Sequence, residues 1–328
     1  MITRRGFMQA PLGALAALSP AAERPARAGT SVPLTIILAP SNLGLRPPRA
    51  GHQPGTWRAP QTLIAAGLAA AARASRVIAI ERPVYSFDSQ PGTRIRNGRS
   101  IRAFSLRLAE VVRSVLGSGG FPVVIGGDCS ILLGGLYGLR LAGGRGLVHV
   151  DGHSDFYQLG DHETSLGAAA GMDLALASGR GDPVVASLPG VGAPLARDED
   201  IVQIGERNAP HDRDRIPDTG ITQITVQHAL AKRIDAAAAT AVAKLQAAGT
   251  QRSWLHVDLD VLDQRVMPAV DSPGSPGFDF DQLADLVREL RLSGRIAGAD
   301  FAIYDPELDP DRRYAQPIAH CIARGVRG

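Results

Sequence analysis

Three short polar clusters in the sequence contain side-chain types that bind metal ions. They are Gly126-Gly127-Asp128-Cys129-Ser130, Asp151-Gly152-His153-Ser154-Asp155 and His256-Val257-Asp258-Leu259-Asp260. Carboxylates, imidazoles and a thiol are the usual protein ligands of divalent metals. Each cluster alone has an ordinary explanation, as a polar turn or a solvated strand end. The presence of all three in one chain indicates a metal site.

The number of carboxylates explains why metal ions are expected. If the second and third clusters meet Cys129 in one crevice, they bring together four carboxylates, one or two imidazoles and a thiol. Carboxylates this close cannot all stay ionised unless cations balance their charge. The economical arrangement is a two-metal site, in which bridging carboxylates hold both ions and a water between them is acidified to hydroxide. Such a hydroxide attacks an electrophilic carbon, and a carboxylate then passes the proton to the leaving amine.

Each cluster lies at the end of a predicted strand. Eight short apolar runs without strict alternation predict strands buried on both faces, at 34–38, 77–80, 122–125, 147–150, 201–204, 221–225, 254–259 and 299–303. Helical patterns lie between them at 60–74, 101–116, 131–141, 227–248 and 279–292. This alternation predicts an α/β fold, a three-layer α/β/α sandwich around a mostly parallel, doubly wound sheet. Ligands bind at the carboxyl ends of the strands in such sheets, where all three clusters lie.

The composition fits one globular domain. The chain has 328 residues, 45% of them hydrophobic, and its 37 Gly and 23 Pro are spread along the sequence. The formal net charge of +3 comes from residues 1–28, and the body has no Lys/Arg run, which argues against a nucleic-acid partner. The two cysteines, Cys129 and Cys321, are too few for a disulfide scaffold.

Residues 1–28 have the pattern of a cleavable export signal. A basic start with Arg4-Arg5 precedes an apolar stretch at 7–22, and small residues follow at Ala26 and Ala28. The arginine pair resembles a twin-arginine signal, whose pathway carries folded proteins. We therefore predict an exported protein, periplasmic or secreted, with a mature domain at 29–328 and no stable membrane span after cleavage. The alternative is a basic terminus of a cytoplasmic enzyme.

The order of the three clusters resembles the ureohydrolase family of arginases, agmatinases and formimidoylglutamases. The family's blocks are Gly-Gly-Asp-His-Ser, Asp-Ala-His-x-Asp and a Ser-x-Asp-x-Asp strand followed by a Pro-rich loop; here they read GGDCS, DGHSD and HVDLDVLDQRVMPAVDSPGSPG. The stretches 42–44 and 55–60 also resemble the family's substrate-side loop. The resemblance runs from about Leu34 and implies an arginase-like fold with two manganese ions. It also implies hydrolysis of guanidino or formimino compounds by a trimer or hexamer.

The resemblance implies six metal ligands in two sets. Asp151 and Asp258 would bridge the ions, Cys129 and Asp155 would complete one ion, and His153 and Asp260 would complete the other. By resemblance, Asp155 would also carry the proton to the leaving amine. Asp128 would face away from the ions and anchor the residues that bind them.

Cys129 departs from the family pattern, which has histidine at this position. A soft thiolate favours Zn, Fe, Co or Ni, whereas the other five ligands are four oxygens and one imidazole and suit Mn. We therefore expect two divalent ions, either Mn or one of these softer metals. The alternative is that Cys129 is a small buried apolar residue beside a one-metal site.

Two further departures lie on the predicted substrate side. Ala170 stands where the family has a histidine, and alanine cannot move a proton; His162 or Glu163 either takes that role or belongs to a charged surface loop. Ile303 stands where arginases have a glutamate that binds the substrate guanidinium. We therefore expect L-arginine to be a poor substrate and a hydroxylated or neutral analogue to be a better one.

His256 replaces a small residue of the family pattern. Because side chains alternate along a strand, His256, Asp258 and Asp260 share one face of the predicted strand. His256 is therefore a candidate catalytic residue that orients a bridging carboxylate or donates to a substrate oxygen. The alternative is a strand histidine whose hydrogen bonds are satisfied inside the protein.

These features predict a metal-dependent hydrolase that cleaves a carbon–nitrogen bond of a small guanidino, amidino or hydroxyguanidino compound. A catalytically silent binding protein, which the metals only stabilise, is the alternative. The retained metal ligands favour the enzyme, whereas Ala170 and Ile303 favour the silent protein.

Overall fold

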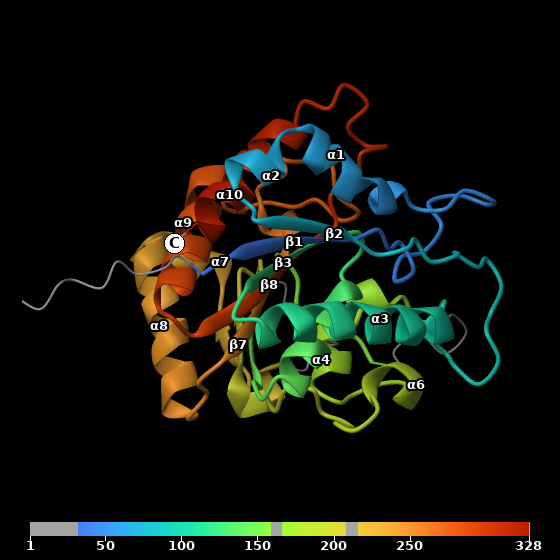
Figure 1. The fold of residues 1–328 in the computed structure, drawn as a ribbon, viewed down its shortest axis with the longest axis horizontal. Coiled ribbons are helices and arrows are strands. Elements are labelled where there is room, and N and C mark those ends of the chain that lie inside the picture. The colour runs from blue at the N-terminus through green and yellow to red at the C-terminus, as the bar shows by residue number, and fades with distance from the viewer. Residues whose placement is uncertain (1–31, 159–165, 208–215, 328) are drawn as a thin grey trace, which may run out of the picture. The chain divides into compact units, whose positions relative to one another are not determined.

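The computed structural model describes residues 32–158, 166–207 and 216–327 (Figure 1). The export-signal prediction for residues 1–28 lies outside this part of the chain, and so do His162 and Glu163. Within the described residues, no helix is long and apolar enough to cross a membrane.

The core of the fold is an eight-stranded sheet in which every pairing is parallel. The strands are β1 (Leu34–Ala39), β2 (Arg76–Ala79), β3 (Phe121–Gly126), β4 (Gly146–Val150), β5 (Ile201–Ile204), β6 (Thr222–Ile224), β7 (Ser253–Asp258) and β8 (Ile296–Ala302). Their order is β2-β1-β3-β8-β7-β4-β5-β6. All eight predicted strands are therefore present, within a few residues of their predicted ends.

Helices cover both faces of this sheet (Figure 1). They are α1 (Ala59–Ala65), α2 (Leu68–Ala71), α3 (Gly98–Gly117), α4 (Ile131–Leu141), α5 (Asp173–Ala177), α6 (Pro183–Ala186), α7 (Val226–Lys232), α8 (Ile234–Ala247), α9 (Phe280–Leu292) and α10 (Ala315–Val326). Helices α1, α2, α9 and α10 lie on one face, and α3, α4 and α6 lie on the other. The three-layer sandwich is confirmed.

Burial of the strands follows from their sequences. Every residue of β1, β3, β4, β5 and β7 is buried, as expected for apolar, β-branched runs covered on both faces. Strand β2 lies at the sheet edge and is mostly exposed. On α3, buried Ile101, Phe104, Leu108 and Val112 recur every three or four residues and form one apolar stripe.

Two predicted helices are each divided in two. Gly67, with φ of +91°, separates α1 from α2, and Arg233, with φ of +75°, separates α7 from α8. A residue with positive φ cannot continue a right-handed helix, so each pattern ends and restarts there. Helix α10 was not predicted, although its buried residues pack beside α9.

Candidate metal centre

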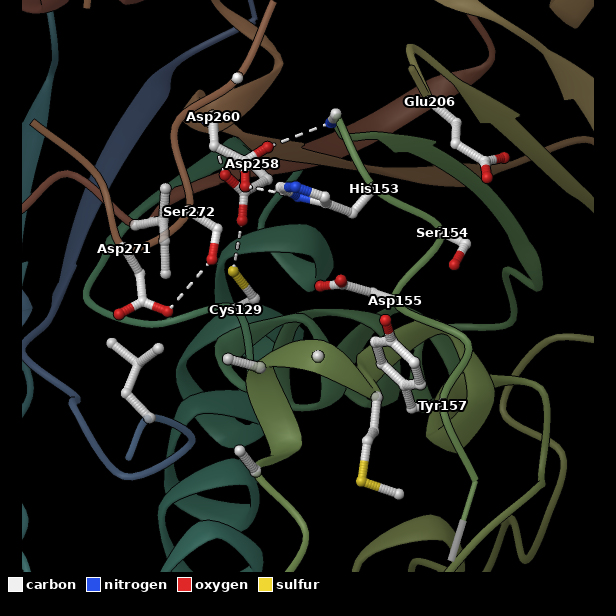
Figure 2. Close-up of a pocket in the computed structure, with 18 of the residues that line it drawn as sticks. Cys129, His153, Ser154, Asp155, Tyr157, Glu206, Asp258, Asp260, Asp271 and Ser272 are labelled. Atoms are coloured by element: carbon white, nitrogen blue, oxygen red, sulfur yellow. Dashed lines mark hydrogen bonds and ion pairs between the residues drawn. The ribbon is translucent and has the colours of Figure 1, made fainter. Parts of the chain in front are cut away.

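The three polar clusters meet at the carboxyl ends of β3, β4 and β7, on the floor of a cavity of about 720 Å³. Figure 2 shows Cys129, His153, Asp155, Asp258 and Asp260 converging there. The walls are partly apolar, with Leu45, Tyr157, Ala170, Met172 and Ile303 among the lining residues. Both pocket departures predicted from the sequence, at positions 170 and 303, therefore face this cavity.

Each of the first two clusters contains a glycine that another chain segment approaches closely. A Cβ atom on Gly127 would lie 2.2 Å from the Ser41 carbonyl oxygen, and one on Gly152 would lie 2.0 Å from Nη1 of Arg207. The contact at Gly127 is with backbone atoms, so a glycine is required there by the approach of the loop after β1. The contact at Gly152 is with the end of a flexible side chain, which can move aside.

Cys129, Asp155 and Asp258 form the first group of candidate ligands. One ligand atom from each lies within 4.8 Å of the others, and all three side chains are buried. The Cys129 Sγ lies 2.6 Å from Oδ2 of Asp258. Cys129 therefore lies among the carboxylates and also lines the cavity.

Asp151, Asp258 and Asp260 form a second group, in which one carboxylate oxygen of each residue lies within 4.8 Å of the others. His153 lies beside it, with Nδ1 2.8 Å from Oδ2 of Asp260 and 3.6 Å from Oδ1 of Asp151. Asp258 belongs to both groups, whereas Asp151 joins the second and also a group with His153 and Asp155. The structure thus brings together all six predicted ligands.

Asp151 tests whether a cation fits this arrangement. Its carboxylate is fully buried, and Oδ1 accepts the backbone N–H of His153 at 2.6 Å. Its Oδ2 is buried and has no hydrogen-bond partner among the described residues, although Nε2 of His149 lies 3.8 Å away. Burial lowers the pKa of His149 to about 3, so this imidazole is not a charged partner. A buried carboxylate oxygen without a hydrogen bond costs free energy, and a divalent cation would pair with it. The donor set and this oxygen both fit divalent metal ions.

The pKa values of the cluster reflect crowded negative charge. Burial, with repulsion from neighbouring carboxylates, raises the pKa of Asp155 and Asp258 well above its ordinary value. Burial and the Asp258 charge do the same to the pKa of the Cys129 thiol. Burial disfavours the charged form of His153, but hydrogen bonds to Asp151 and Asp260 raise its pKa to about 12. The cluster therefore holds protons that bound cations would displace.

The backbone is left-handed at two residues that line the cavity. Asp155 has φ of +45° and Ile303 has φ of +75°. This conformation is uncommon for any residue with a side chain and is a genuine outlier for a β-branched one. Such residues cost about 1–3 kcal/mol each and cluster at functional sites. The Ile303 N–H donates to the Gly127 carbonyl oxygen at 2.7 Å, which ties this strained position to the first cluster.

Asp128 lies apart from the cavity and supports it. The residue is fully buried; Oδ2 accepts the Ser41 hydroxyl at 2.6 Å and Oδ1 accepts the Ser130 N–H at 2.9 Å. It is in no metal-binding group of the described residues. These contacts fasten the loop after β1 to the loop that carries Cys129, in keeping with the predicted anchoring role.

Asp260 reaches the site differently from the prediction. Strand β7 ends at Asp258, and Leu259–Val261 form a 3-10 turn, so strand alternation does not orient Asp260. The Asp258 carboxylate accepts the Asp260 N–H at 2.7 Å. This turn brings the Asp260 side chain back to the cluster.

His256 is buried and is not among the residues that line the cavity, so the structure gives it no direct contact with a substrate. One of its ring nitrogens lies within 4.8 Å of a carboxylate oxygen of Asp151, so the predicted role of orienting a bridging carboxylate stays a prediction. The His256 Nδ1 lies 2.5 Å from Oδ1 of Asp300, and its Nε2 lies 3.4 Å from Oδ2 of Asp173. Its ring stacks on that of His149, with centroids 4.9 Å apart. Burial opposes the charge of His256, but Asp300 raises its pKa to about 10.

Sequence reasoning missed this buried polar layer. His149 precedes Asp151 by two residues on β4, so strand alternation could have indicated it. Asp173 begins α5, and no sequence pattern relates it to His256. No role was predicted from the sequence for four further residues that line the cavity: Arg46, Glu206, Arg207 and Asp271.

Comparison with known proteins identifies the family. The model of the arginase family matches residues 34–325. The chain is 29% identical over 269 residues to a formimidoylglutamase from Aeromonas salmonicida, covering 74% of this chain and 73% of that protein. It is 30% identical over 229 residues to an arginase from Bacillus caldovelox, covering 69% and 75%.

The chain belongs to the arginase family. This confirms the resemblance predicted from the sequence. The members of the family are metal-dependent hydrolases. The arginase-family fold is also confirmed by the structure of arginase from Bacillus cereus, which superposes with a TM-score of 0.77 at 24% identity. That alignment covers 91% of this chain and 99% of the other.

Proposed function

We propose that this member of the arginase family uses two divalent metal ions to hydrolyse a carbon–nitrogen bond of a guanidino, amidino or hydroxyguanidino compound. The observation that carries the proposal is the convergence of six candidate ligands, in overlapping groups, on the floor of one cavity. The names of the relatives also favour a hydrolase over a silent binding protein, since they are formimidoylglutamases and arginases.

The candidate ligands would divide the work between two ions. Cys129 and Asp155 would hold one, His153 and Asp260 would hold the other, and Asp151 and Asp258 would contact both. When bound, divalent cations supply a Lewis acid and acidify a water near neutral pH. Asp155 lines the cavity, and its pKa is raised by burial and by Asp151, so it is suited to take a proton and return it to the leaving amine.

We propose that the two ions are Mn if the oxygen ligands determine the metal preference. If the Cys129 thiolate determines it, we propose Zn, Fe, Co or Ni. Burial keeps Cys129 a thiol in the absence of a cation, and a bound cation would favour the thiolate. Softer metals gain more from a thiolate than manganese does, whereas the oxygen ligands suit manganese.

Export and assembly complete the proposal. Residues 1–28 would direct the folded protein out of the cytoplasm, which would allow the metals to be loaded before export. The mature chain would form a trimer or hexamer, as the family resemblance implies. Its mass in solution, measured by light scattering after gel filtration, tests the assembly.

Metal analysis combined with a substrate panel tests the catalytic proposal. Protein purified from its own compartment should hold two divalent ions per chain. It should release urea, ammonia or formamide from at least one compound of the panel, and removal of the metals should abolish that release. A chain that binds two metals but hydrolyses no guanidino, amidino or formimino compound would support the silent binding protein.

A further inference from the structure

Two carboxylates line the cavity besides those of the candidate ligands, among the described residues. They are Glu206 and Asp271, and Figure 2 shows them on opposite sides of the metal centre. Glu206 accepts a hydrogen bond from the Gln223 amide. Asp271 lies 3.5 Å from the Ser272 hydroxyl, and no ion pair joins it to another described residue.

The loop that carries Asp271 is fixed at its base. The carboxylate of Asp263 accepts the Ser275 hydroxyl at 2.8 Å and the Gly277 N–H at 3.2 Å. The same carboxylate accepts two guanidinium N–H groups of Arg265, at 2.8 and 2.9 Å. Both ends of the loop thus meet at one side chain, which makes Asp271 part of a preorganised wall.

The middle of this loop is bonded to the chain that leaves β8. The Asp305 N–H donates to the Ala269 carbonyl oxygen at 2.9 Å. Ala269 lies two residues before Asp271, and Asp305 lies two residues after Ile303. Ile303 is buried and lines the cavity, but its side chain offers no polar atom. On this wall the negative charge that Ile303 cannot supply is therefore available from the Asp271 carboxylate of the neighbouring loop.

We propose that Asp271 binds the cationic amidino or guanidino group of the substrate. This inference rests on the proposed function and adds that the substrate is positively charged. An amidinium is a planar cation with paired N–H donors, and a carboxylate receives such a pair in two parallel charge-assisted hydrogen bonds. The candidate metal ligands on the cavity floor would be engaged by the ions, so they would not be available for this contact.

The surroundings of Asp271 suit this role. Asp271 is exposed to solvent at the cavity wall, so a substrate can reach its carboxylate. The surrounding protein raises its pKa, whereas the Ser272 hydroxyl and the charges of His153 and Arg46 act in the opposite direction. The expectation of a neutral substrate rested on the residues at 170 and 303, and Asp271 supplies a carboxylate that it did not consider.

Asp271→Asn tests the inference in the metal-loaded protein, with Asp311→Asn as a control at an exposed carboxylate outside the cavity. Calorimetry would measure the binding of agmatine and of N-carbamoylputrescine, in which a neutral urea replaces the guanidinium. We expect Asp271→Asn to weaken agmatine binding about 10- to 100-fold, the worth of a charge-assisted hydrogen bond, and to leave the neutral ligand unchanged. Asp311→Asn should change neither, and all proteins should retain two metals.

The double variant Asp271→Asn/Ile303→Glu provides a rescue. A carboxylate returned to the same wall should restore preference for the cationic ligand. The inference is overturned if wild type does not distinguish the two ligands, or if Asp271→Asn binds agmatine as wild type does. The heat of any agmatine hydrolysis is measured separately and subtracted, so the assay reports binding. Failure of the wild type to hydrolyse any panel compound would therefore overturn the proposed function and leave the role of Asp271 to be decided by binding.

Discussion

The Cys129 Sγ lies 2.6 Å from Oδ2 of Asp258, which joins the loop after β3 to the last residue of β7. Both side chains are buried, and burial disfavours the charged form of each. In the absence of a cation the thiol donates to the carboxylate. With a cation bound, the two atoms are close enough to act on the same ion, so the residue at position 129 should influence which metal is held.

Cys129→His should change the metal preference of the protein. Imidazole is a harder ligand than thiolate, so the variant should take up a larger share of Mn, relative to Zn, Fe, Co and Ni, than wild type does. Elemental analysis of both proteins, loaded from an equimolar mixture of these metals, measures the change. An unchanged metal distribution would show that Cys129 does not bind a metal.

Asp151→Ala and Asp258→Ala should each remove both ions, because the proposed bridging carboxylates contact two. Cys129→Ala and Asp260→Ala should mainly weaken the binding of one ion. An ion whose free concentration is 100 times its dissociation constant stabilises the fold by about 2.7 kcal/mol. Thermal stability should therefore decrease when metal occupancy decreases. Metal content and melting temperature are measured together. Two ions retained by Asp258→Ala would contradict its bridging role.

Ile303→Glu should raise activity on L-arginine, because it adds a second carboxylate to the cavity wall that carries Asp271. The substitution adds a carboxylate at a position that lines the cavity. A charge-assisted hydrogen bond is worth about 1.5–3 kcal/mol, or about 10- to 100-fold in KM. Steady-state kinetics with L-arginine checks the change, and Ile303→Gln controls for size without charge. Activity unaffected by either substitution would show that position 303 does not contact the substrate.

Asp263→Asn should loosen the loop that carries Asp271. The Arg265 side chain, followed by other donors, holds the pKa of Asp263 below its ordinary value. Since the folded pKa is below the unfolded value of about 4, its contribution is fully present above pH 4 and is lost as the pH falls through the folded pKa. Denaturant unfolding should show the variant about 1–3 kcal/mol less stable at pH 7, with a smaller difference at pH 3. A difference independent of pH would argue against a charge effect.

Replacement of Arg4 and Arg5 by lysine should retain the precursor in the cytoplasm if residues 1–28 form a twin-arginine signal. The exported wild-type protein should begin near Gly29. Cell fractionation and N-terminal sequencing test both statements. Export of the lysine variant at the wild-type level would exclude the twin-arginine route.

The sequence by itself predicted the sheet and the six candidate ligands. Apolar, β-branched runs such as β3 and β4 are local signals, because their burial on both faces requires apolar residues throughout. The ligand clusters were recognisable because strand ends and turn glycines place polar residues at fixed spacings. Helix divisions at Gly67 and Arg233 were not predictable, since the backbone there follows the packing of neighbouring elements.

The tertiary structure alone decided which distant side chains share a surface. His256 has the same strand face as Asp258, yet its partners are Asp173 and Asp300, which lie on α5 and β8. Asp271 lies within a Pro-rich loop that has no periodic pattern, and a hydrogen bond between Asp305 and Ala269 brings this loop beside the segment that carries Ile303. Spacing along a chain fixes the direction of a side chain within one element, whereas its contacts depend on how elements far apart in sequence pack together.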